Sequence, residues 1–126
     1  MKIERIDHIV LTVADLNKTI DFYTNILGLN IVAFSAGRLA LTFGNQTINL
    51  HENGKEFEPK ASLPTCGSID LCLITSTQIE NVLTELKNKG VEIIEGIVER
   101  TGAIGKIRSI YIRDPDKNLI ELSNCQ

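Results

Sequence analysis

Several features are scarce or missing in this sequence of 126 residues, beginning with tryptophan, of which there is none. Basic charge is not in excess, because 16 Asp and Glu residues outnumber 13 Lys and Arg residues, and a nucleic-acid partner is therefore not expected. No apolar run approaches the roughly 18 residues of a membrane-spanning helix. Charged residues at positions 2, 4, 5 and 7 interrupt the start of the chain, so we expect neither a signal peptide nor a membrane partner.

Cysteine and histidine are also few. The three cysteines, Cys66, Cys72 and Cys125, are odd in number and lack the spacing of a zinc finger, which predicts a protein of the reducing cytoplasm. The two histidines, His8 and His51, are the only imidazole side chains that a metal site could use. With 43% hydrophobic and 23% charged residues, the chain has the composition of one globular domain.

The two halves of the sequence repeat the same pattern. Short apolar strands are predicted at residues 8–13 and 70–75. Each begins with a side chain that can bind a metal, His8 in the first strand and Asp70 in the second. A repeat of this kind indicates two similar modules in one chain.

A helix is predicted after each of these strands, because apolar residues follow at steps of three or four. Asp15 and Thr77 are the expected N-caps, since their side-chain oxygens can accept from unpaired backbone N–H groups. Gly28 and Gly90 are the expected helix ends, where glycine adopts the left-handed conformation without a steric clash. In both halves, twenty residues separate the first strand residue from this glycine.

Three more strands complete each half. They are predicted at residues 31–34, 38–43, 47–51, 92–98, 107–113 and 119–123. Each half is then a βαβββ module, and the predicted fold class is α+β, with mixed sheets that form a curved, half-open barrel. We place the first module at residues 1–52, a linker at 53–66 and the second module at 67–126, within a single domain.

Polar side chains interrupt the last strand of each module. Asn49 and His51 share one face of the first of these strands, because side chains alternate, and Glu121 has the position equivalent to Asn49 in the second. Glu121 carries the strongest signal, because a carboxylate within an apolar strand is costly to bury unless it is paired or binds a metal. A histidine at a strand start, such as His8, is more often a polar cap than a ligand.

If the two sheets curve toward each other, His8, Asn49, Asp70 and Glu121 meet at one centre. A histidine, two carboxylates and an amide suit a divalent ion such as Zn, Ni, Mn, Fe or Mg. His51 would either replace the amide or orient a metal ligand.

These residues resemble the vicinal oxygen chelate superfamily, which includes glyoxalase I and the fosfomycin- and bleomycin-resistance proteins. Residues 6–13 and the Leu27-Gly28-Leu29 segment are similar to its opening module. Residues 111–122 are similar to its closing signature, with Lys117 at a turn position where the family usually has glycine. Residues 48–51, 56–61 and 100–103 most resemble small bacterial glyoxalase-domain proteins, including virulence-associated ones.

The resemblance implies a divalent metal that binds two adjacent oxygens of a substrate, and a homodimer that often exchanges modules between chains. His8 matches a ligand histidine of the family and Glu121 a ligand glutamate. Asp70 stands where the family usually has a second histidine, and Asn49 stands where glyoxalase I has a glutamate. The expected metal ligands are His8, Asp70 and Glu121. The expected catalytic groups are Glu121 and His51.

The expected substrate contacts are Asn49, Ser109, Tyr111 and Arg100. Ser109 and Tyr111 match positions that bind the phosphonate in fosfomycin-resistance proteins. Arg100 opens a predicted loop, residues 100–106, whose two glycines and two cations suit an anionic substrate.

Three functions follow from the resemblance. The first is a metal-dependent lyase or isomerase acting on a small oxygenated substrate, or a related transferase or dioxygenase. The second is thiol transfer to, or hydrolysis of, an antibiotic-like epoxide. The third is a metal-free protein that sequesters a ligand, as the bleomycin-resistance proteins do.

Overall fold

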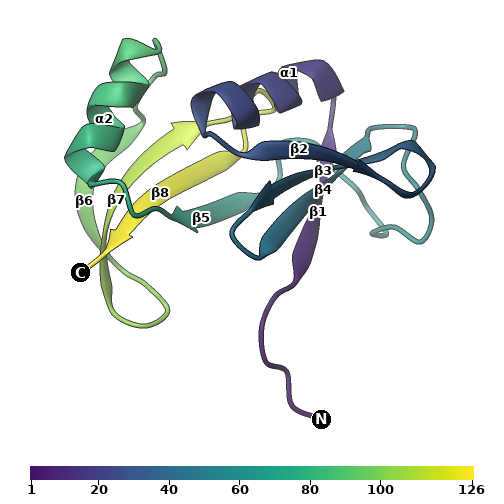
Figure 1. Cartoon of the computed structure of the whole chain (residues 1–126), viewed down its shortest axis with the longest axis horizontal. Coiled ribbons are helices and arrows are strands. Elements are labelled where there is room, and N and C mark those ends of the chain that lie inside the picture. Colours follow the sequence, from purple (N-terminus) through teal and green to yellow (C-terminus); the bar gives the residue numbers. More distant parts are fainter. The chain divides into compact units, whose positions relative to one another are not determined.

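The computed structural model describes residues 1–126, which divide into two compact units, Met1–Gly67 and Ser68–Gln126. Each unit contains one four-stranded mixed sheet (Figure 1). The model confirms the α+β class and the two βαβββ modules. That the two modules form one domain with residues 53–66 as its linker stays a prediction.

The first unit has the strand order β1-β4-β3-β2, in which β1 runs parallel to β4 and the other neighbours are antiparallel. Its helix α1 continues into a short π-helical turn, and its sheet buries a small apolar core around Leu11, Val13 and Tyr23. The elements are β1 (His8–Val13), α1 (Leu16–Asp21), the π-helical turn (Phe22–Ile26), β2 (Asn30–Phe34), a 3-10 turn (Ser35–Gly37), β3 (Arg38–Phe43) and β4 (Gln46–Glu52).

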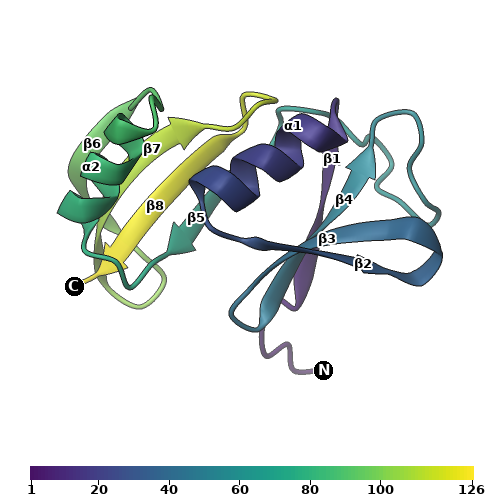
Figure 2. The same ribbon diagram turned by 45° about the horizontal axis from the view of Figure 1, so that its top comes forward.

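The second unit repeats this topology with the order β5-β8-β7-β6, in which β5 runs parallel to β8. Figure 2 shows β8 between β5 and β7. The elements are β5 (Asp70–Ile74), α2 (Ile79–Asn88), β6 (Glu95–Thr101), β7 (Lys106–Arg113) and β8 (Leu119–Cys125). Neither α1 nor α2 combines the length and the apolar content that crossing a membrane requires.

Strand pairing in the two units follows the same register. His8 lies opposite Thr47, two residues before Asn49, and Asp70 lies opposite Leu119, two residues before Glu121. This confirms the alignment of the repeat. Since residues two apart share a strand face, Asp70 and Glu121 belong to the same face of the second sheet.

The helix α2 packs on the opposite face of that sheet, over β7 and β8 (Figure 1). Its buried residues Ile79, Val82 and Leu86 recur at steps of three and four, as an amphipathic helix requires. They close the core with Ile110, Ile112, Ile120 and Leu122 of the sheet. Full burial of one such side chain contributes about 1.5–3 kcal/mol.

The helix ends were predicted correctly at three of four places. Asp15 Oδ1 accepts from Lys18 N at 3.0 Å, and Gly28 and Gly90 both have a φ of 74°. Thr77 was wrong as the N-cap of α2. The cap residue is Gln78, and the first helical N–H, that of Ile79, donates to Asn124 Oδ1 of β8 at 2.7 Å.

Strand β6 lies three residues later than predicted, at 95–101 instead of 92–98. Inside β6 the pairing with β7 shifts between Gly96 and Val98, and a Cβ atom at Gly96 would lie 3.0 Å from the Ile110 backbone. The prediction of a loop at residues 100–106 was therefore wrong: Arg100 pairs with Ile107 inside the sheet, and only residues 102–105 form the turn.

A buried polar network ties the turn between β7 and β8 to the start of β5. Asp114, which is 3% exposed, accepts from the Asn118 backbone N–H through Oδ1 at 3.0 Å and from Asn118 Nδ2 through Oδ2 at 2.8 Å. Asn118 Oδ1 in turn accepts from Ile69 N, next to β5, at 3.0 Å. The network therefore joins the end of β7 and the start of β5 to the turn that leads into β8.

We predict that Asn118→Ala lowers the free energy of unfolding by about 2–4 kcal/mol, because it removes two buried hydrogen bonds and leaves their partners unsatisfied. Urea denaturation followed by circular dichroism measures the change. Asn88→Ala, at an exposed position near the end of α2, is the control and should be near neutral. A loss of stability in Asn118→Ala no larger than in the control would contradict this role for the network.

Candidate functional site

Polar residues gather on one face of the second sheet, opposite α2. Tyr111 of β7 and Cys72 of β5 both lie directly opposite Glu121 of β8, so the three form one row across the sheet. Ser109 and Ser123, which lie opposite each other on β7 and β8, form part of the next row. Asp70 and Cys72 are two residues apart on β5 and so point to the same side.

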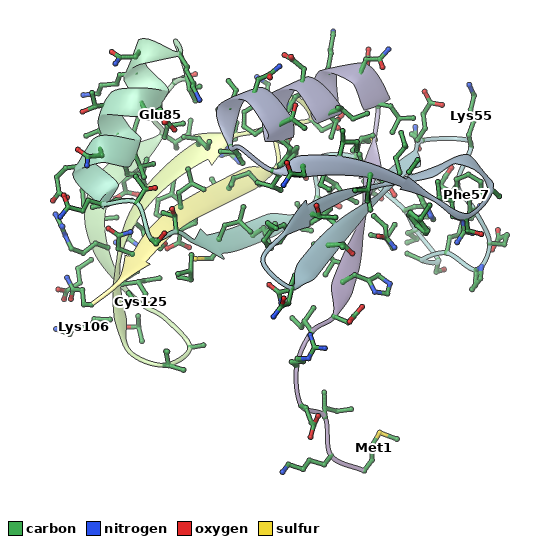
Figure 3. All side chains as sticks on the ribbon, viewed as in Figure 1. Met1, Lys55, Phe57, Glu85, Lys106 and Cys125 are labelled. Atoms are coloured by element: carbon green, nitrogen blue, oxygen red, sulfur yellow. The ribbon has the colours of Figure 1, made fainter.

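This face borders a hollow of about 600 Å³ within the second unit. Ile74, Ile104 and Ile107 give it apolar walls, whereas Glu121 and Tyr111 bring polar groups to it. Cys125, at the end of β8, lies beside the turn between β6 and β7 (Figure 3). A largely apolar hollow with a few converging polar groups has the character of a small-molecule site.

Glu121 is half-buried in this hollow, and Ser109 Oγ donates to its Oε1 at 2.6 Å. The ion pairs of the second unit involve other carboxylates, so no Lys, Arg or His neutralises Glu121. A carboxylate held by a hydroxyl donor in apolar surroundings is suited to bind a cation.

Arg100 and Tyr111 form a second polar group in the hollow. Arg100 Nε donates to the Tyr111 hydroxyl oxygen at 3.2 Å, its Nη2 lies 3.3 Å from Glu95 Oε1, and its Nη1 donates to the Glu99 carbonyl at 3.1 Å. All three guanidinium nitrogens are therefore engaged within the unit, and Glu95 balances the charge. Arg100 thereby holds Tyr111, and its contact with a substrate stays a prediction.

The Tyr111 hydroxyl remains protonated at neutral pH. Burial raises its pKa, the Arg100 hydrogen bond lowers it, and the charge of Glu121 raises it. Because its oxygen accepts from Arg100, its own proton is available to Glu121 or to an oxygen of a bound molecule.

Cys72 brings a thiol to the same row. Its Sγ lies 3.3 Å from Ser123 Oγ, and burial is the main cause that raises its pKa, with a further increase from the charge of Glu121. The thiol is therefore in its protonated form at neutral pH. Asp70, at the start of β5, is exposed and forms no ion pair, so its carboxylate is available as a ligand.

His8 lies at the start of β1 in the first unit, and its side chain is 47% exposed. Its Nδ1 lies 2.9 Å from Asp7 Oδ2, and this hydrogen bond lowers the pKa of Asp7. Pairing of Nδ1 with a carboxylate leaves Nε2 as the coordinating nitrogen, the arrangement that orients many metal-bound histidines.

Asn49 and His51 lie on β4 of the first unit. Thr47 Oγ1 donates to Asn49 Oδ1 at 3.3 Å. His51 is 8% exposed and packs against the Phe57 ring at 5.7 Å between centroids, and the Arg38 guanidinium lies over the same ring at 4.6 Å. Phe57, labelled in Figure 3, thus covers His51 with a residue of the segment that follows β4.

The second unit brings together Glu121, Ser109, Tyr111, Arg100 and Asp70 on one sheet face. His8, Asn49 and His51 belong to the first unit, and neither unit alone gathers three or more side chains into a metal site. The ligand set His8, Asp70 and Glu121 stays a prediction. Its donors fit a divalent ion by type, because it combines an imidazole with Nε2 available and two carboxylates without cationic partners.

Sequence reasoning missed two residues of this face. Cys72 was not assigned to the site, although its place two residues after Asp70 already puts it on the same face. Glu95, which engages Arg100, was not considered, because the pairing of these two side chains depends on the fold of β6 and not on a local sequence pattern.

Comparison with known proteins identifies the family. Residues 5–122 match the family model described as Glyoxalase/Bleomycin resistance protein/Dioxygenase superfamily. The chain is 61% identical to virulence protein STM3117 of Salmonella typhimurium over 98% of its own length and 85% of that protein. A crystal structure of that protein superposes with a TM-score of 0.98 at 60% identity and covers 100% of both chains.

A more distant similarity is to a metallothiol transferase. The chain is 30% identical to the metallothiol transferase FosB of Staphylococcus epidermidis over 97% of its own length and 82% of that protein. On the family match and these similarities, the chain belongs to the glyoxalase/bleomycin resistance protein/dioxygenase superfamily, the vicinal oxygen chelate family that its sequence resembles.

Proposed function

We propose that the protein is a divalent-metal-dependent enzyme of the glyoxalase-like type, a lyase or isomerase that acts on a small oxygenated substrate. The observation that carries the proposal is Glu121, a carboxylate without a cationic partner in a largely apolar hollow, held by the Ser109 hydroxyl. Such a group is costly unless a cation balances it.

The charge of the hollow supports a metal as the bound cation. Glu121 contributes negative charge, and Glu95 already balances Arg100. An oxygenated or anionic substrate would meet repulsion here unless a cation came between it and the carboxylate. The similarity to a metallothiol transferase supports the same conclusion.

The ligands of the proposed metal are His8, Asp70 and Glu121, and its identity among Zn, Ni, Mn, Fe and Mg is left open. When bound, the metal supplies Lewis acidity to two adjacent substrate oxygens. Tyr111, with its hydroxyl oxygen held by Arg100, donates a hydrogen bond to the substrate.

Glu121 is the proposed proton carrier as well as a ligand, because it is the carboxylate at the hollow. His51 is a weaker candidate than the sequence indicated, since it is 8% exposed and Phe57 packs on its ring. Asn49, whose amide cannot act as a base, is kept as a proposed substrate contact.

Ligand sequestration without chemistry is the second candidate, and the apolar walls of the hollow favour it. Ile104 is 93% exposed and Ile74 is 58% exposed, which suits binding of a large apolar molecule. In that case the protein would bind its ligand equally well with and without metal, as a resistance protein that traps an antibiotic would.

We further propose a cytoplasmic homodimer in which His8 of one chain and the two carboxylates of the other complete each site. The division of the proposed ligands between two compact units is compatible with this assembly, and the resemblance implies a homodimer that often exchanges modules.

We predict that Glu121→Gln weakens Mn²⁺ binding by at least about 100-fold, more than loss of an outer-shell partner usually costs. The amide keeps the shape of the side chain but removes the charge. Asn49→Ala, which removes at most a neutral dipole, is the matched control and should bind almost as the native protein does. Calorimetric titration measures all three, and equal affinities would remove Glu121 from the metal site.

Mixing two defective variants tests the shared site. Chains carrying His8→Ala and chains carrying Glu121→Gln, with different affinity tags, are refolded together and the mixed dimers are purified. If modules are exchanged, one of the two sites keeps both native ligands, so about one Mn²⁺ per mixed dimer is expected. Mixed dimers without bound Mn²⁺ would place each site within one chain.

A further inference from the structure

The hydrogen bonds between the hydroxyl groups beside Glu121 all run in one direction, because each hydroxyl has only one proton to donate. Glu121 carries no proton in its ionised form, so the 2.6 Å contact with Ser109 Oγ uses the single hydroxyl proton of Ser109. Ser109 Oγ also lies 2.7 Å from Ser123 Oγ, and it has no second proton to give. Ser123 must therefore donate to Ser109.

The same reasoning extends to the thiol. Once the Ser123 proton is directed to Ser109, Ser123 Oγ can only accept from Cys72 Sγ, which lies 3.3 Å away. The chain of donors thus runs from Cys72 through Ser123 and Ser109 to Glu121, with every proton pointing toward the carboxylate.

Burial makes this series of hydrogen bonds rigid and separates its hydroxyl groups from a bound substrate. Ser109 and Ser123 are both 0% exposed, and each hydroxyl has two partners in the chain. Hydrogen bonds in series polarise one another in a low-dielectric interior, so the last bond, to Glu121 Oε1, is the strongest of the three. Its effect is to fix one carboxylate oxygen and the orientation of the other.

We propose that Ser109 is a positioning residue for Glu121, oriented by Ser123 and Cys72, and that it does not contact the substrate. This differs from the phosphonate contact that resemblance to fosfomycin-resistance proteins suggests for Ser109. The inference rests on the proposed function, because it assigns the residues that hold the proposed metal ligand in place. Loss of such a partner costs about 10–100-fold in metal affinity.

Four variants test the proposal. Ser109→Ala and the size-matched Ser109→Cys remove the strong donor, Ser109→Thr keeps a hydroxyl, and Ser123→Ala removes the group that orients Ser109. We expect Ser109→Ala and Ser109→Cys to weaken Mn²⁺ binding by about 10–100-fold, Ser123→Ala to weaken it less, and Ser109→Thr to restore it. At saturating Mn²⁺, the electron paramagnetic resonance line shape of bound Mn²⁺ should change in Ser109→Ala, which a loss of stability alone would not cause.

A second measurement needs no metal. In metal-free protein with ¹³C-labelled glutamate, the Glu121 Cδ resonance is identified by its absence in Glu121→Gln. It should move in Ser109→Ala and in Ser123→Ala, and return toward its native position in Ser109→Thr. If Ser109→Ala does not fold, Ser123→Ala alone carries the test through both readouts.

The outcomes separate the two proposals. Native Mn²⁺ affinity in Glu121→Gln would overturn the proposed metal site, whatever the serine variants do. Weak binding in Glu121→Gln, together with native affinity and a native Cδ position in Ser109→Ala, would overturn only the positioning role of Ser109.

Discussion

The parallel pairing of β5 with β8 is the constraint on which the second unit depends, and a buried turn fixes it. Asn118 accepts from the Ile69 N–H just before β5, and Asp114 holds Asn118 and the turn into β8. A slip of one residue in this pairing would turn every side chain of the strand to the other face. The place of Glu121 in the hollow therefore depends on hydrogen bonds at the start of its strand.

Charge then determines what the hollow can bind. Glu95 balances Arg100, so the cation that lines the hollow is occupied in holding Tyr111 rather than in pairing with Glu121. Around Glu121 the polar neighbours are hydrogen-bond donors, which stabilise a negative charge without neutralising it. An ionised carboxylate supported in this way, with apolar walls around it, is best balanced by a bound cation.

Much of this arrangement could be predicted because its signals are local. The repeat, the strand alternation and the helix-ending glycines predicted both modules and aligned Asp70 with His8 and Glu121 with Asn49. The features that were missed depend on distant residues. The irregularity at Gly96 arises from contact with β7, the cap of α2 comes from Asn124, and the bond from Ser109 to Glu121 requires the register between two strands.

Anomalous diffraction at the manganese edge, from crystals grown with Mn²⁺, tests the central claim most directly. The account predicts one strong anomalous peak at roughly 2.0–2.3 Å from a Glu121 oxygen, from His8 Nε2 and from an Asp70 oxygen. The His8 and Glu121 that meet at this peak would belong to different chains of a dimer. A crystal saturated with Mn²⁺ in which no peak lies within coordination distance of Glu121 would contradict it.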